Sequence, residues 1–313
     1  MISKSATDKR NCVLNAHFTK NARAAWGHVI ASVCGGKSGR VLLPGYIGYT
    51  AREGSGVHDP VVANGAEFDF YKIKGDLSVD MEDLARQLAK GFDIVLVIHY
   101  FGFCRNDLDA LAQLCRDVGA VLVEDCAHAF YLDAPGSRIG DVGEFAFYSL
   151  HKYLALDTGG LLKVNSKDRS IMPIPAEIEA DRDVLAQYAL SDFSAISSRR
   201  RQNYEAYVQL LEGLQNHIEI MYVLEDADIP QSFAIRVKHG KREPLYFHLM
   251  SKGMTMIALY YRMIDQLRCE EHALAVEISS QILNLPVHQD TNLEDVYAIC
   301  REIRAYFEGQ GAK

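Results

Sequence analysis

Two apolar runs separated by a helical segment constrain the fold of this chain more than any other feature. Residues 93–100 (DIVLVIHY) form a long β-branched run, and residues 120–123 form a second continuous apolar run. Between them, apolar residues recur every three or four positions, which is the spacing of a helix: Leu108, Leu111, Leu114 and Val118. Strands that are apolar on both faces and joined by a helix indicate a parallel βαβ unit covered on both sides. The sequence therefore predicts an α/β fold.

Similar patterns predict the other elements and two domains. Further strands are expected at residues 41–43, 144–149, 160–164, 219–224 and 233–238, and an apolar segment spans 282–286. Helices are expected over about 184–214, 244–252 and 268–281, and after a capping box that pairs Thr291 with Glu294. The composition changes within the helix over 184–214. We therefore expect a large domain with a mostly parallel sheet at residues 1–200 and a smaller C-terminal α+β domain at residues 201–313.

Charge and cysteine content limit the class of protein. The 313 residues carry a formal net charge of −8, and the basic residues form no patch of the kind that binds nucleic acid. The seven cysteines are scattered and odd in number, which is typical of reduced thiols in the cytoplasm. The first residues lack the apolar core of a signal peptide, and no stretch is apolar enough to cross a membrane. We expect a cytoplasmic protein with no nucleic-acid or membrane partner.

Two side chains next to strand ends are the first candidates for chemistry. Asp125 lies at the end of the strand that begins with residues 120–123, and α/β folds bind their ligands at such strand ends. Lys152 follows the strand 144–149 by three residues, within a loop rich in apolar side chains. Such surroundings lower the pKa of an amine and free it as a nucleophile toward an aldehyde. Both residues also have a common explanation without a catalytic role, since aspartates often cap helices and loop lysines are usually solvated.

Pyridoxal 5'-phosphate (PLP) needs groups of these kinds. A lysine binds its aldehyde as a Schiff base, a carboxylate keeps its ring nitrogen protonated, and backbone N–H groups at a helix N-terminus hold its phosphate. Lys152 and Asp125 follow consecutive predicted strands, so one ring could lie between them. The small residues of Asn21–Ala25 open a predicted helix and offer the phosphate cradle, although they could equally begin an ordinary amphipathic helix.

Taken together, five segments resemble the DegT-type sugar aminotransferase family of fold type I PLP-dependent enzymes. They are Asn21–Ala25, the strand end VLVEDCAHA (121–129), the glycines at 136, 140 and 143, Lys152 with Gly159-Gly160, and ILNLPVHQDTNLEDV (282–296). The resemblance implies a fold type I PLP-dependent transferase and a homodimer. It also implies a role for each matching residue. Lys152 would carry the Schiff base and move protons, and Asp125 would pair with the ring nitrogen. His128 would reach the ring hydroxyl or stack near it, and the backbone amides of Ala22 and Arg23 would hold the phosphate.

The resemblance leaves some positions open. The ring-stacking aromatic falls by spacing on Gly48, which cannot stack, so we predict Tyr49, with Tyr46 second. The family's phosphate-binding serine is replaced by Phe147, and Ser149 is the candidate hydroxyl.

Two further departures bear on the reaction and the dimer. Counting from the strand places His151 at the lysine position, as in related sugar dehydratases, whereas counting back from Gly159-Gly160 restores Lys152. The family's G-Y-N-x-R segment, whose asparagine reaches a neighbouring subunit, is not evident after Asn165.

The predicted function is that of a PLP-dependent aminotransferase in polysaccharide biosynthesis, which moves an amino group from glutamate to a keto group of a nucleotide-linked sugar. Two alternatives stay open. One is a PLP-dependent dehydratase or eliminase that uses His151 or His128, and the other is a PLP-fold protein that has lost catalysis and binds or regulates a partner. A zinc enzyme is disfavoured because the eleven histidines form no H-E-x-x-H motif and the cysteines no C-x-x-C pair.

Overall fold

The structure is a computed structural model that describes residues 15–35, 37–130 and 136–309. Its strands are β1 (Ala16–Thr19), β2 (Arg40–Pro44), β3 (Glu67–Tyr71), β4 (Ile94–Ile98), β5 (Val121–Cys126), β6 (Phe145–Ser149), β7 (Gly160–Val164), β8 (Ile218–Ile220), β9 (Ser232–Val237) and β10 (Ile282–Pro286). Its α-helices are α1 (Ala22–Cys34), α2 (His58–Ala63), α3 (Met81–Leu88), α4 (Leu108–Val118), α5 (Arg182–Leu190), α6 (Phe193–Leu210), α7 (Arg242–Ser251), α8 (Ala273–Gln281) and α9 (Leu293–Glu308).

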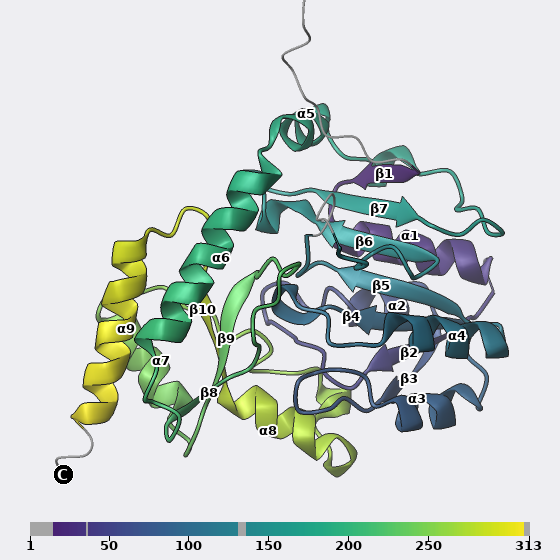
Figure 1. Ribbon diagram of the computed structural model, residues 1–313. Coiled ribbons are helices and arrows are strands. Elements are labelled where there is room, and N and C mark those ends of the chain that lie inside the picture. Colours follow the sequence, from purple (N-terminus) through teal and green to yellow (C-terminus); the bar gives the residue numbers. More distant parts are fainter. Residues whose placement is uncertain (1–14, 36, 131–135, 310–313) are drawn as a thin grey trace, which may run out of the picture.

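A seven-stranded sheet forms the larger layer (Figure 1). Its order is β1-β7-β6-β5-β4-β2-β3, and β7 alone runs antiparallel to its two neighbours. Every residue of the central strands β4, β5 and β6 is buried, because helices cover both faces of the sheet. The predicted α/β fold with a mostly parallel sheet is confirmed.

The crossover helix predicted from the apolar spacing is α4. Asp107 caps its N-terminus by accepting a hydrogen bond from the backbone N–H of Ala110, and Gly119 ends it in the left-handed conformation at φ 74°. Its buried residues face the sheet: Leu108, Leu111, Ala112 and Cys115. In Figure 1, α3 and α4 lie in front of the sheet and α1 lies behind it. Helix α1 packs on β6 and β7, next to the strand ends that carry the candidate residues.

A three-stranded antiparallel sheet, β10-β9-β8, lies beside the large one (Figure 1). Helices α6, α7 and α8 pack against it, and α9 packs on α6 and α7. The expected domain boundary at residue 200 falls inside α6. Arg200 itself is completely buried there.

Four predicted elements differ clearly from their expected bounds. The strand expected over 219–224 is β8 (Ile218–Ile220), and residues 221–224 belong to no strand. The single helix expected over 184–214 is two helices, because the side chain of Asp192 caps α6 by accepting from the N–H of Ala195. The helix expected over 268–281 begins only at Ala273, after two short 3-10 turns. The capping box is formed by Asn292 and Asp295, one residue later than predicted, because the backbone at Asn292 takes the extended conformation of a cap.

The described cysteines all have free thiols: Cys34, Cys104, Cys115, Cys126, Cys269 and Cys300. Cys12 lies outside the described residues. Within the described ranges, no helix has the length and apolar character that spanning a membrane requires.

Candidate active site

A cavity of about 1020 Å³ lies at the carboxyl ends of β5 and β6, beside the start of α1. It brings together all of the site residues predicted from the sequence: Ala22, Arg23, Tyr49, Asp125, His128, Ser149 and Lys152. The opposite wall comes from the C-terminal third of the chain, through residues 256–261 and Arg242.

Gly160 brings the start of α1 against the large sheet. It pairs with Ser149 on one side, at the end of β6, and with Thr19 on the other, at the end of β1. The end of β6 and the residues just before α1 therefore flank β7 at the same level of the sheet. A Cβ atom at residue 160 would lie 2.4 Å from the carbonyl carbon of Asn21, so a larger residue would push the helix away. The glycine of the Gly159-Gly160 pair therefore has a packing role.

The N-terminus of α1 offers an anion site to the cavity. The Asn21 side chain accepts a hydrogen bond of 2.8 Å from the N–H of Ala24. The N–H groups of Ala22 and Arg23 belong to the first turn, which has no intrahelical acceptors, and the helix dipole favours an anion there. The side chain of Arg23 is engaged by protein groups, since it donates to the carbonyl of Glu53 at 2.6 Å and pairs with Asp59 at 3.6 Å.

Lys152 ends a 3-10 turn, η2 (Leu150–Lys152), which directly follows β6. The N–H of Leu150 donates to the carbonyl of Gly159 at 2.9 Å and closes the loop. Arg200 donates to the carbonyl of Lys152 at 2.8 Å, and its guanidinium lies 4.1 Å from the ring centre of Tyr153. Burial lowers the pKa of the Lys152 amine to about 8, against the opposing effect of the Asp125 and Glu53 charges. The amine is therefore available as a nucleophile near neutral pH.

Asp125 is 4% exposed at the floor of the cavity. Burial raises the pKa of its carboxyl to about 6, although a 2.8 Å hydrogen bond from the N–H of Ala127 and the charges of Lys152 and His99 oppose the rise. Asp125 and Lys152 each change the pKa of the other, so the two ionisable groups form one electrostatic site.

His128 faces the same cavity with an unused polar atom. Its Nδ1 is buried and has no hydrogen-bond partner among the described residues. Burial and the Lys152 charge hold its pKa well below the usual range, so the ring is neutral. The hydroxyl of Tyr153 donates to the carbonyl of His128 at 2.8 Å and ties it to the lysine turn. A buried nitrogen without a partner is costly unless a ligand satisfies it.

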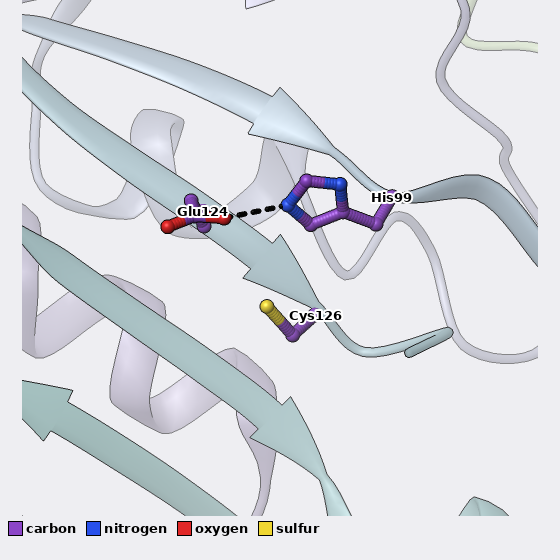
Figure 2. A group of neighbouring side chains, drawn as sticks. All are labelled: His99, Glu124 and Cys126. Carbon is purple, nitrogen blue, oxygen red and sulfur yellow. Dashed lines mark hydrogen bonds and ion pairs between the residues drawn. The ribbon is translucent and has the colours of Figure 1, made fainter. Parts of the chain in front are cut away.

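Glu124 and Cys126, the neighbours of Asp125 along β5, form a cluster with His99 in which one ligand atom of each side chain lies within 4.8 Å of the others (Figure 2). The Glu124 carboxylate accepts 2.7–2.9 Å hydrogen bonds from His99 Nε2 and from three backbone N–H groups: those of Gly140, Val142 and Gly143. Burial alone would lower the pKa of His99, but Cys104 and Glu124 raise it to about 10. The carboxylate is thus saturated by protein donors, and we interpret the cluster as a buried ion pair that fixes the glycine loop and supports the ionised form of Asp125.

The remaining predicted residues differ in how they face the cavity. Ser149 Oγ lies 3.3 Å from Nδ1 of His151, which is exposed and also lines the cavity. Phe147 lines it too and stacks on Trp26. Tyr46, the second choice for the stacking aromatic, is completely buried and is not among the lining residues.

The sequence did not indicate that the C-terminal third of the chain forms one wall of the cavity. Tyr260, Tyr261 and Arg242 line the cavity. No motif links them to Lys152, because only the tertiary fold brings them to it.

The chain is similar to known proteins both in sequence and in fold. The model of the DegT/DnrJ/EryC1/StrS aminotransferase family matches residues 55–171 and 184–304. The chain belongs to this family. The unmatched residues 172–183 lie after Asn165, in the part of the chain where the family's G-Y-N-x-R segment is not evident.

Curated relatives match over different lengths. A GDP-perosamine synthase from Vibrio cholerae is 34% identical over 110 residues, which is 34% of this chain and 29% of that protein. A GDP-perosamine synthase from Escherichia coli O157:H7 is 21% identical over 260 residues, 73% of this chain and 70% of that protein.

Solved structures share the fold over almost the whole chain. The aminotransferase TlmJ from Streptoalloteichus hindustanus superposes with a TM-score of 0.78 at 21% identity, covering 95% of this chain and 87% of that one. The putative sugar aminotransferase Spr1654 from Streptococcus pneumoniae in its pyridoxamine-phosphate (PMP) form superposes with a TM-score of 0.77 at 16% identity, covering 94% and 88%. The predicted fold type I class is confirmed.

PLP is the cofactor of this family, and the cavity fits it. A buried carboxylate, an amine of lowered pKa and a neutral histidine with a free ring nitrogen lie around one space. The N-terminus of α1 lies at the same cavity and suits a phosphate.

Proposed function

We propose that this protein is a PLP-dependent aminotransferase that moves an amino group from glutamate to a keto group of a nucleotide-linked sugar. The observation that carries the proposal is the pair of Lys152 and Asp125. The two side chains come from neighbouring strand ends, line one cavity and shift each other's pKa. Membership of an aminotransferase family and relatives named as GDP-perosamine synthases support the reaction and the substrate class.

Each predicted residue has a role that its surroundings suit. Lys152 would hold PLP through Nζ and, once released, remove the proton from the α-carbon of the amino donor. Asp125, oriented by the N–H of Ala127, would keep a proton on the ring nitrogen. His128 would bond the ring hydroxyl through Nδ1. PLP itself would supply the electron sink for the carbanion.

The phosphate would lie at the other end of the cavity. The backbone N–H groups of Ala22 and Arg23 would donate to it, with the hydroxyl of Ser149 as a further donor. Arg52 and Arg242 also line the cavity, and we propose that they bind the phosphates of the nucleotide or the carboxylates of the donor.

We further propose that the protein works in the cytoplasm as a homodimer, with one domain up to residue 200 and a second beyond it. The free thiols of the described cysteines support a reducing compartment. Light scattering of the purified protein would measure the oligomeric state.

A spectroscopic titration tests the proposed reaction. The purified protein should turn yellow with PLP, and glutamate should then remove the yellow band as the amino group is taken up. Adding a nucleotide-linked keto sugar should restore it. A coloured protein that ignores glutamate but releases water from the sugar would support the dehydratase alternative. A protein that stays colourless with PLP would refute the proposal and favour a binding or regulatory role.

A further inference from the structure

Gly48 leaves a gap in the wall of the cavity that another residue fills. It lines the cavity, and its φ angle is not positive, so its backbone does not require glycine. A Cβ atom built at residue 48 would lie 1.7 Å from Cδ1 and 2.4 Å from Cε1 of Tyr260. The ring of Tyr260 therefore occupies the space into which a side chain at position 48 would extend.

The backbone holds Tyr260 in that place. Residues 262–264 run antiparallel to 47–49, with 2.9 Å from the N–H of Tyr49 to the carbonyl of Arg262 and 3.1 Å from the N–H of Ile264 to the carbonyl of Ile47. Ser279 Oγ donates to the carbonyl of Tyr260 at 2.7 Å. Tyr260 has a φ of 60°, a conformation that costs energy for a residue with a side chain and that persists where the surroundings enforce it.

The Tyr260 ring is also fixed by other aromatic rings. Tyr46 and Tyr100 meet it edge-on at centroid distances of 5.3 and 5.9 Å. His128 lies 5.7 Å away at an angle of 34°. Burial and the Asp125 charge raise the pKa of the Tyr260 hydroxyl, so the ring stays neutral and lies within electrostatic reach of the carboxylate that would face the cofactor.

Tyr49 is the competing candidate, and its ring is already engaged. The guanidinium of Arg262 lies 5.2 Å from the centre of the Tyr49 ring. A face that carries a cation is less available to a pyridinium ring, which is also positively charged.

We propose that Tyr260 stacks on the ring of PLP and replaces, from the C-terminal part of the chain, the aromatic contact that residue 48 cannot make. This inference rests on the proposed binding of PLP. It makes cofactor binding depend on the docking of residues 260–264 against residues 47–49.

The test measures binding of PMP, which cannot link to Lys152 and so reports the non-covalent contacts alone. Affinities come from equilibrium dialysis, and the circular dichroism of the bound cofactor reports how its ring is held. Tyr260→Ala should weaken PMP binding about tenfold, which corresponds to about 1.4 kcal/mol, and should reduce the dichroism, because the variant loses both the stacking contact and the buried area of the ring. Tyr260→Phe should bind within about twofold of the wild type.

A double variant tests the geometry and controls for folding. Gly48→Phe alone should clash with Tyr260, whereas Gly48→Phe combined with Tyr260→Ala should recover affinity and dichroism. Unchanged or tighter binding in Tyr260→Ala would overturn the inference, as would a larger loss in Tyr49→Ala. If the wild type binds neither PMP nor PLP, the proposed function fails as well. If the wild type binds PMP and Tyr260→Ala binds it equally well, only the stacking role of Tyr260 is refuted.

Discussion

Asp125→Asn should stabilise the cofactor-free protein against unfolding and lower its affinity for PLP. Burial moves the pKa of Asp125 from 3.8 to about 6, and each pKa unit corresponds to about 1.4 kcal/mol. The ionised carboxylate therefore costs the folded state about 3 kcal/mol once both folded and unfolded chains have lost the proton. Asparagine keeps an oxygen that can accept the hydrogen bond from Ala127, and it carries no charge to desolvate.

The sign of the pH dependence follows from the raised pKa. A carboxyl group that holds its proton more tightly when folded adds stability below its unfolded pKa, and this contribution is lost as the pH rises through about 6. The free energy of unfolding of Asp125→Asn should therefore exceed that of the wild type only slightly near pH 4, and by at most about 3 kcal/mol above pH 7.

Urea unfolding of the cofactor-free proteins at pH 5 and pH 8 measures this difference. The exposed Asp168 provides a control, because Asp168→Asn removes the same charge at the surface. Equilibrium dialysis with PLP gives the matching loss of affinity. If Asp125→Asn is less stable than the wild type at pH 8, or binds PLP equally well, the assignment of Asp125 as a buried partner of the ring nitrogen is wrong.

Three other predictions concern the surroundings of this pair. Because the pKa of Lys152 is about 8, the stopped-flow rate of PLP capture should rise with pH and level off above about 8, and a plateau only near 10 would mean a fully solvated amine. Gly160→Ala should weaken binding of PLP and of inorganic phosphate more than tenfold by displacing Asn21, whereas Gly75→Ala, which meets nothing within 4 Å, should leave both unchanged; equal effects would contradict the packing role. His99→Ala should cost about 3–5 kcal/mol in urea unfolding because it leaves Glu124 buried without its cation, and a loss below about 1 kcal/mol would show that the pair contributes little.

The sequence was most informative where local chemistry and tertiary position coincide. The apolar runs and the spacing of α4 predicted the parallel sheet, because strands buried on both faces must be apolar throughout. Lys152 and Asp125 could be named because Asp125 lies at the end of β5 and Lys152 lies three residues after the end of β6, and parallel strands end at the same edge of a sheet. Gly160 was recognised only as part of a motif, and the structure supplies its physical reason.

The sequence was least informative where the site depends on distant segments. Tyr260 lies more than one hundred residues beyond Lys152, and nothing in its local sequence distinguishes it from a core tyrosine. The break between α5 and α6 and the cap at Asn292 depend on which of several polar residues folds back on the backbone, which a periodicity pattern cannot decide.

Peptide mapping after reduction would locate the attached cofactor. The protein is loaded with PLP, reduced with borohydride, digested and mapped by mass spectrometry. Our account predicts a single pyridoxyl group on the peptide that contains Lys152. A pyridoxyl group on any other lysine, or none at all, would contradict it.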